Sequence, residues 1–197
     1  LAAKYELDIS PAGVDYYDYE ATHGHEVAGI GRVSSEDFHL EAQSAGLIGI
    51  GSATDLDDGE FVLFGHDNDT LGWINTEVPA DSVLRVGREW VFDVTGSPGG
   101  LLVSLDTALL PPLPDGCNGY QLLLDDDGDF TSGVSFFPLV RNVSAYEVTV
   151  PAIAEGNFIT IATLVPSVSF RFASSAASEL AGTALVEIIL SDTLGTD

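Results

Sequence analysis

The 197-residue chain has very few basic residues: one lysine and five arginines stand against 31 acidic residues. Binding to nucleic acid or to an anionic membrane surface requires a patch of basic side chains that neutralises phosphate groups. Six scattered cations cannot form such a patch, so neither class of partner is expected. The chain also lacks an apolar run of 18 residues, which excludes insertion into a membrane as a helix.

Sulfur-containing residues are nearly absent, with one cysteine and no methionine. Cys117 has no second cysteine to pair with, so cysteine usage neither supports nor excludes an oxidising compartment. Because translation begins at methionine, Leu1 is expected to be a processed end or a fragment boundary. Removal of an export signal would account for such an end. We therefore expect an extracellular or cell-surface protein.

Acidic residues are concentrated in short clusters between apolar runs. The formal net charge is −25, yet 45% of the residues are hydrophobic, which is more than a disordered chain contains. The clusters at 55–60, 66–69 and 125–129 each adjoin an apolar segment, as turns adjoin strands. Salt or bound cations reduce the self-repulsion of so much charge. A saline or calcium-containing medium is therefore expected.

Eleven segments have the composition or the alternation of β-strands, with Gly, Pro and Asp between them. They are 27–33, 46–52, 60–65, 89–95, 101–106, 120–124, 134–140, 145–150, 158–163, 168–172 and 183–190. The pattern predicts an all-β fold: an antiparallel β-sandwich or jelly roll of about 10–12 strands with little helix. We assign residues 1–163 to one sandwich domain and 164–197 to a C-terminal extension with one or two further strands.

The last predicted strand is apolar on both faces. Its apolar residues are Leu185, Val186, Ile188, Ile189 and Leu190, interrupted only by a glutamate, so both faces need cover. One interpretation is a central strand of the chain's own sandwich. The other is that the segment completes the sheet of a neighbouring copy by strand addition, which would make the chain its own partner in a homopolymer.

One acidic cluster has the spacing of a cation-binding loop. Asp125, Asp127 and Asp129 alternate around Gly128, so a tight turn could direct several carboxylate oxygens at one Ca²⁺ ion. The segment is not an EF-hand, because glycine stands at the fourth loop position and phenylalanine at the twelfth. The alternative is a solvated acidic turn. A weaker version of the same pattern comprises Asp55, Asp57 and Asp58.

Structural salt bridges are expected from three of the arginines, because a planar guanidinium is suited to fixing the carboxylates of acidic loops. These arginines are Arg32, Arg85 and Arg88. Trp73 and Trp90 are interpreted as core residues, with a stacking platform for a sugar as the alternative.

His23 and His25 lie two residues apart, so on a strand both rings would share one face. They could then hold a zinc ion together with Glu20 or Glu26. Two histidines do not complete a site, and no HExxH or CxxC pattern supplies more ligands, so we interpret them as a pair in a surface loop. The sequence has no GxSxG segment and indicates no base for Cys117. Catalytic activity is therefore not expected.

Five segments carry a resemblance to a known family. They are residues 1–5 (LAAKY, resembling LAxKYG), 25–32 (HEVAGIGR, resembling AGIGR), 61–67 (FVLFGHD, resembling a strand that ends in GxD/N), 85–91 (RVGREWV, resembling RxxRxW) and 124–131 (LDDDGDFT, resembling DxDGDF). In order and spacing they resemble a domain of unknown function from very large secreted surface proteins of Bacteroidota-type bacteria. The resemblance covers roughly residues 1–163. It implies an extracellular, non-enzymatic structural or adhesive role without a defined ligand.

Four Asp-Ser/Thr-apolar triads resemble those on which some of these bacteria place O-glycans, with ordinary turn chemistry as the alternative. Their hydroxyl residues are Thr70, Ser82, Thr107 and Thr193.

The sequence as a whole favours a non-enzymatic extracellular structural protein: a self-assembling cell-surface filament subunit joined by β-strand complementation. The alternative is a calcium-assisted carbohydrate-binding or adhesion module of a larger surface protein, which would have glycans as partners.

Overall fold

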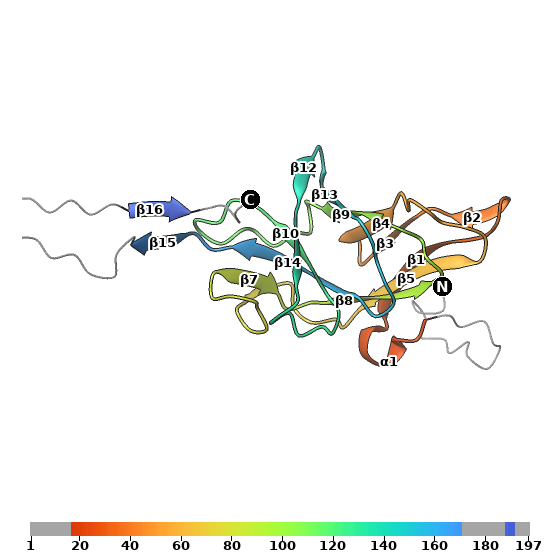
Figure 1. The fold of residues 1–197 in the computed structure, drawn as a ribbon, viewed down its shortest axis with the longest axis horizontal. Coiled ribbons are helices and arrows are strands. Elements are labelled where there is room, and N and C mark those ends of the chain that lie inside the picture. Colours follow the sequence, from red (N-terminus) through yellow and green to blue (C-terminus); the bar gives the residue numbers. More distant parts are fainter. Residues whose placement is uncertain (1–16, 171–187, 192–197) are drawn as a thin grey trace, which may run out of the picture.

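A computed structural model describes residues 17–170 and 188–191, and nearly all of their regular structure is β (Figure 1). Two large antiparallel sheets are packed together around a common apolar core. Within the described ranges the single helix is α1 (Glu20–His23), which makes about one turn. No helix there is long and apolar enough to cross a membrane. The predicted all-β antiparallel sandwich with little helix is confirmed.

The larger sheet contains nine strands. Its main path runs through β11 (Ser135–Pro138), β10 (Gln121–Asp125), β14 (Phe158–Leu164), β8 (Trp90–Thr95), β5 (Glu60–His66), β1 (His25–Ser34) and β2 (Asp37–His39). Two further strands, β6 (Trp73–Ile74) and β7 (Val83–Val86), extend it where β7 pairs with β14. On its other side β14 pairs with β10 along its length.

The smaller sheet contains five strands. Their order is β12 (Val140–Asn142), β13 (Ala145–Val150), β9 (Leu101–Asp106), β4 (Ile48–Gly51) and β3 (Glu41–Ser44). β12 and β13 form a hairpin that projects from the body in Figure 1. The edges of this sheet are therefore β12 and β3.

The main core lies between the two sheets. Strand β9 shows how the sequence builds it, because Leu101, Val103 and Leu105 are fully buried while the residues between them are only half-buried. This alternation places every second side chain against the opposite sheet. Trp90 and Phe92 on β8 fill the facing side of the same core.

A second, smaller core covers the other face of the larger sheet. It consists of Val83, Leu123, Phe130 and Ala162, with partly buried apolar residues around it. Because β14 contributes to both cores, five consecutive residues of this strand, 159–163, are buried. A strand covered on both faces has a nearly continuous apolar sequence without alternation. The segment FITIATL fits this description apart from its two buried threonines.

The eleven predicted strands overlap strands of the structure, within the residues that the structure describes. The predicted bounds of β9 and β13 agree with the structure at both ends. The predicted strand 134–140 is divided instead between β11 and β12, which lie in different sheets. The short strands β2, β3, β6 and β7 were not predicted. All three residues of β2 are exposed, and such a segment has no alternation between buried and exposed positions to detect.

The two C-terminal strands form a separate two-stranded sheet. β15 (Ser167–Phe170) pairs with β16 (Ile188–Ser191) in antiparallel register from Ser167↔Ser191 to Phe170↔Ile188. In Figure 1 this ribbon extends beyond the end of β14. Among the described residues, β16 joins neither large sheet. The interpretation of this segment as a central strand of the sandwich is therefore wrong for Ile188, Ile189 and Leu190, whereas Leu185 and Val186 lie outside the described residues.

Candidate functional site

The acidic loop at 125–131 is organised by the carboxylate of Asp125, the last residue of β10. Although Asp125 is 4% exposed, its Oδ2 accepts backbone N–H bonds from Gly128 at 2.9 Å, Phe130 at 3.3 Å and Asp127 at 3.4 Å. Gly128 has a φ of +81°, a conformation that side chains with a Cβ rarely adopt. The glycine in DxDGDF thus allows the chain to fold back over the Asp125 carboxylate.

The other carboxylates of this loop also accept hydrogen bonds within it. Asp127 accepts the backbone N–H of Asp129 at 3.1 Å, and Asp129 accepts both the backbone N–H and the hydroxyl of Thr131. The backbone hydrogen bond from Thr131 lowers the pKa of Asp129, because it stabilises the ionised form. One carboxylate oxygen from each of the three aspartates lies within 4.8 Å of the others. The predicted calcium ligands are therefore brought together, in a loop that its own N–H groups already support.

Replacing Asp125 with Ala is expected to lower the free energy of unfolding by about 2 to 3 kcal/mol, because three backbone donors lose a charged acceptor in a buried position. Replacing Asp127 with Ala should cost much less, since this carboxylate is exposed and accepts a single bond. Urea unfolding of both variants in EDTA checks the difference. Equal losses of stability would contradict the central role of Asp125.

The weaker acidic cluster has a different organisation. Arg32 pairs with Asp58 at 2.7 Å, and Glu60 accepts the backbone N–H groups of Asp57 and Ser97. These two hydrogen bonds, led by the one from Asp57, lower the pKa of Glu60. In the part of the chain that the structure describes, the carboxylates of Asp55, Asp57 and Asp58 do not form a group close enough to hold one ion.

Of the three arginines that were predicted to form salt bridges, two do so in the structure. Arg32 pairs with an acidic loop as expected, and Arg85 is buried at 1% exposure and pairs with Glu77 and with Glu89 at 2.8 Å. Arg88 donates instead to the backbone carbonyl of Asp69 at 2.8 Å. It has no ion pair within the described ranges, so the predicted salt bridge is wrong for Arg88.

A second group of ligand atoms lies where α1, β5 and β8 meet. A ring nitrogen of His23, the last residue of α1, and one carboxylate oxygen each from Asp67 and Glu89 all lie within 4.8 Å of one another. Asp67 directly follows β5, and Glu89 directly precedes β8. We refer to His23, Asp67 and Glu89 as the His23 cluster. Because its members are more than 20 residues apart in sequence, no local motif predicted it.

The sequence suggested that His23 and His25 form a pair in a surface loop. The structure does not place His23 in such a loop. His23 is buried at 9% exposure, whereas His25 is exposed and stacks on the ring of His66 with centroids 5.8 Å apart. The α1 turn reaches the sheet because Gly65 has no side chain: a Cβ there would lie 2.3 Å from the carbonyl oxygen of His23. The interpretation of a surface pair is therefore wrong for His23.

Burial shifts the pKa values of three groups in and beside the His23 cluster. Desolvation lowers the pKa of His23, with an opposing contribution from Asp67. Desolvation also lowers the pKa of His66 to about 4, aided by the charge of Arg88. Burial raises the pKa of Glu89 to about 7, although the Arg85 guanidinium acts in the opposite direction. Each shift favours the neutral form, as expected for ionisable groups removed from water.

Residues 9–154 match the model of a family described as a domain of unknown function, DUF8202. The chain belongs to the DUF8202 family. The predicted resemblance to a domain of unknown function is thereby confirmed. The match includes the acidic loop and the His23 cluster, whereas β15 and β16 of this DUF8202 protein lie beyond it. Comparisons with curated proteins and with solved structures gave no match.

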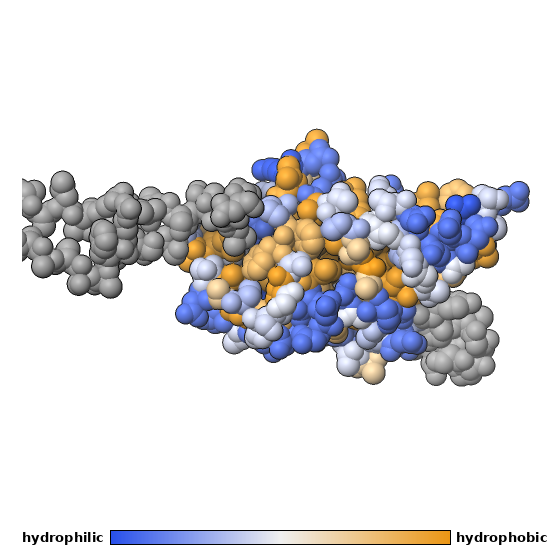
Figure 2. All heavy atoms as spheres, viewed as in Figure 1, coloured by the Kyte–Doolittle hydropathy of each residue, from blue (hydrophilic) through white to orange (hydrophobic). Residues whose placement is uncertain are grey.

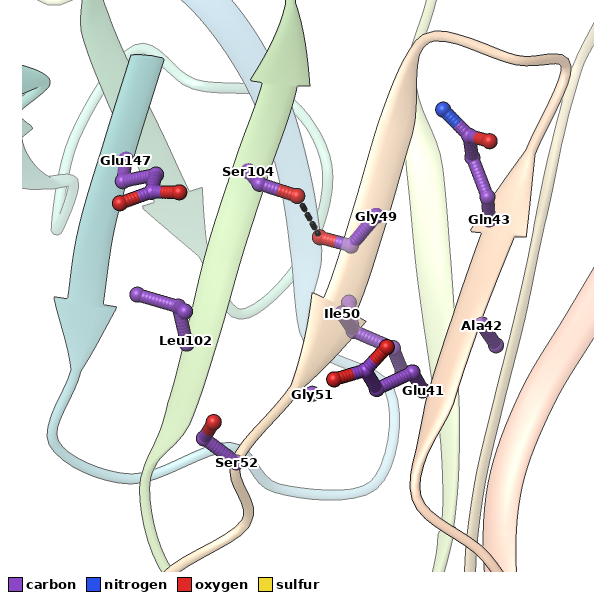
Figure 3. Close-up of a pocket in the computed structure, with 10 residues that line it drawn as sticks. All are labelled: Glu41, Ala42, Gln43, Gly49, Ile50, Gly51, Ser52, Leu102, Ser104 and Glu147. Atoms are coloured by element: carbon purple, nitrogen blue, oxygen red, sulfur yellow. Dashed lines mark hydrogen bonds between the residues drawn. The ribbon is translucent and has the colours of Figure 1, made fainter. Parts of the chain in front are cut away.

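A hollow of 430 Å³ lies on the outer face of the smaller sheet of this DUF8202 domain (Figure 3). It is lined by residues of β3, β4, β9 and β13, and Gly49 and Gly51 leave the space open. Glu41 and Glu147 line it from separate strands, and Ser104 donates a hydrogen bond to the carbonyl of Gly49. No aromatic residue lines this hollow. It therefore offers no stacking platform for a sugar ring.

The two tryptophans also contribute no exposed platform. Trp90 is fully buried in the core, as predicted. Trp73 is half-buried, stacks on Tyr120 and donates its indole N–H to the carbonyl of Pro112 at 2.8 Å. Both are parts of the packed body, which weighs against recognition of sugars by tryptophan stacking.

The candidate glycosylation residues differ in exposure. Thr70 and Ser82 are exposed, whereas Thr107 is half-buried and donates its hydroxyl to the carbonyl of Ser144 at 2.9 Å. Thr193 lies outside the described residues. Exposed hydroxyls in loops are accessible to modification, so Thr70 and Ser82 remain the candidates that the structure favours.

Proposed function

We propose that this DUF8202 chain is a non-enzymatic structural protein of the extracellular surface, and that its copies assemble by β-strand complementation. The observation that carries the proposal is the ribbon of β15 and β16, which among the described residues joins neither large sheet. An isolated two-stranded ribbon is marginally stable in water and needs a further strand or a packing partner. The apolar sequence Ile188-Ile189-Leu190 increases that need. The resemblance to large secreted surface proteins of Bacteroidota-type bacteria supports the location.

We propose that the C-terminal ribbon of one copy pairs with the edge strand β12 of the smaller sheet in another copy. We call this edge the acceptor. Val140 is 68% exposed and Val143, at the tip of the hairpin, is 90% exposed. Figure 2 shows apolar residues next to hydrophilic ones at this projecting tip. Val143 also has a φ of +44°, which is strained for a β-branched residue. An apolar edge strand with exposed backbone groups is a template for pairing with another chain.

Electrostatics favour β12 over the other apolar edge. β12 itself carries no acidic residue and carries the exposed cation Arg141. One carboxylate lies beside it, that of Glu147 on β13, which accepts a hydrogen bond from Asn142. The edge at β2 also exposes apolar side chains, including Phe38 at 52%, but Glu36 and Asp37 adjoin them. Two copies with a net charge of −25 repel each other least where the edge strand carries a cation and no carboxylate of its own. The β12 edge is therefore where a second copy can approach.

Deleting residues 183–197 is expected to abolish assembly while leaving a folded body, because both large sheets are built from residues 25–164. Sedimentation velocity and electron microscopy of the full chain and the truncated chain, at matched concentration and salt, measure assembly. Circular dichroism checks that the truncated body is folded. If the folded, truncated protein still forms the same polymers, strand complementation by this segment is excluded.

A pair of edge variants identifies the acceptor in the same assay. Val140→Lys with Val143→Lys introduces charge at the β12 hairpin, and charged edge residues prevent strand addition. Val33→Lys with Leu40→Lys makes the same change of charge near the β2 edge, where both residues are exposed. We expect only the first pair to prevent assembly. Loss of assembly in the second pair alone would place the acceptor at β2.

The second candidate is a calcium-assisted carbohydrate-binding or adhesion module of a larger surface protein. The close approach of the Asp125, Asp127 and Asp129 carboxylates favours it, since Ca²⁺ prefers oxygen ligands. Glycan-array binding that disappears in EDTA and returns with calcium would favour this candidate over assembly.

A further inference from the structure

The His23 cluster contains a buried imidazole that lacks a partner for one nitrogen. Nδ1 of His23 lies 3.0 Å from the hydroxyl of Thr22, whereas Nε2 is buried and has no hydrogen-bond partner. A buried polar atom without a partner costs free energy. With two carboxylate oxygens within reach of this ring, a bound ion would satisfy it.

A second buried histidine adjoins the cluster. His66 is 1% exposed and precedes the cluster residue Asp67 in the chain. Its Nδ1 accepts the backbone N–H of Asn68 at 2.9 Å, so its buried and unpartnered Nε2 carries the ring proton. The chain has four histidines, and three of them, His23, His25 and His66, lie at this end of the sandwich. Imidazole is therefore concentrated beside the carboxylates.

The charges around the cluster favour a cation. Asp67 accepts backbone N–H groups from Asp69 and Glu89, and no basic side chain pairs with it in the part of the chain that the structure describes. Glu89 pairs with Arg85, but that arginine is shared with Glu77. Asp67 thus has no cationic partner among the described residues, and Glu89 shares its one guanidinium with Glu77. The nearby Arg88 is directed to the carbonyl of Asp69.

We propose that His23, Asp67 and Glu89 bind a divalent transition-metal ion of the zinc class. Imidazole nitrogen and carboxylate oxygen together are ligands that zinc prefers, whereas calcium and magnesium select oxygen alone. Three protein ligands leave one tetrahedral position for water. The site is separate from the acidic loop and from the proposed assembly edge. The ion would join α1 to the ends of β5 and β8 and so stabilise this end of the sandwich.

Isothermal titration of untagged, EDTA-treated and dialysed protein with ZnCl₂ tests the proposal, with thermal melting and cobalt(II) absorption as further readouts. We expect one equivalent of zinc to bind and to raise the melting temperature, because an ion that binds only the folded state stabilises it. His23→Phe keeps a ring beside Phe158, which lies 5.4 Å from the His23 ring. This variant should weaken zinc binding by about 100-fold or more, beyond the loss caused by changing residues that only orient ligands.

Two variants make the result decisive. His39→Asn removes an exposed histidine on β2, away from the cluster, and should bind zinc like the unchanged chain. Asp67→Asn keeps an oxygen acceptor for the N–H groups of Asp69 and Glu89, so it should fold and bind weakly. The proposal is overturned if His23→Phe binds zinc as tightly as the unchanged chain does. It is also overturned if calcium competes equally with zinc, or if binding is lost equally in His39→Asn.

Discussion

Replacing Arg85 with Met is expected to lower the free energy of unfolding by about 3 to 5 kcal/mol, the cost of breaking a buried ion pair from one side. The guanidinium donates to Glu77 and Glu89, and its cation lies 5.1 Å from the centre of the Phe130 ring. It also donates to the carbonyls of Thr76, Glu77, Val86 and Gly87. Methionine fills the volume but satisfies none of these acceptors, and the half-buried carboxylate of Glu89 would lose its cation.

Urea unfolding followed by circular dichroism measures this loss. Arg32→Met is the matched control, because Arg32 pairs with an Asp58 side chain that is 58% exposed, and such pairs contribute about 0 to 1 kcal/mol. Arg85→Lys should lie between the two, since it keeps the charge but loses the planar set of donors. A midpoint for Arg85→Met equal to that of Arg32→Met would show that the buried network contributes little.

Replacing Trp90 with Ala is expected to destabilise the protein by about 3 to 5 kcal/mol, the usual cost of removing a large buried ring. Trp90 has no exposed surface, packs in the main core and lies edge-on to the ring of His66, with centroids 5.7 Å apart. The cavity left by alanine would open between the sheets. If Trp90 were a platform for a sugar, the same change would reduce binding and leave stability intact.

Trp90→Phe tests whether the loss of stability comes from the lost ring volume. The indole N–H of Trp90 is buried and has no hydrogen-bond partner, so phenylalanine removes an unsatisfied donor and fills most of the space. We expect this variant to be markedly more stable than Trp90→Ala. Fluorescence of the remaining Trp73 during denaturation measures both midpoints. Equal midpoints for the two variants would contradict the packing role of the Trp90 ring.

The strands that could be predicted are those whose burial follows a simple pattern. Strand composition between turn residues predicted β9 at 101–106 and β14 at 158–163, and alternation supported β13 at 145–150. The segment 134–140 is also apolar, but it passes from one sheet to the other between Pro138 and Val140. A change of sheet leaves no local signal, because each half of the segment still has the composition of a strand.

The two candidate sites also differ in how far the sequence could predict them. Asp125, Asp127 and Asp129 are close in sequence, so their spacing and Gly128 were enough to predict that they converge. The His23 cluster comes from three segments that only the sheet pairing brings together. Asp67 was noted only as part of the acidic cluster at 66–69, and Glu89 was not singled out. His23 itself was assigned to the surface, because nothing in its sequence surroundings indicates the contact with Gly65.

The sequence alone determined that this chain is a strongly anionic all-β protein with its charge in turns, because strand alternation and turn residues are local properties. The tertiary structure decided which buried groups meet: Arg85 with two glutamates, His23 with two carboxylates, and β16 with β15 instead of a large sheet. These contacts join residues far apart in the chain. They depend on strand order and register, which the alternation of side chains along a single strand does not encode.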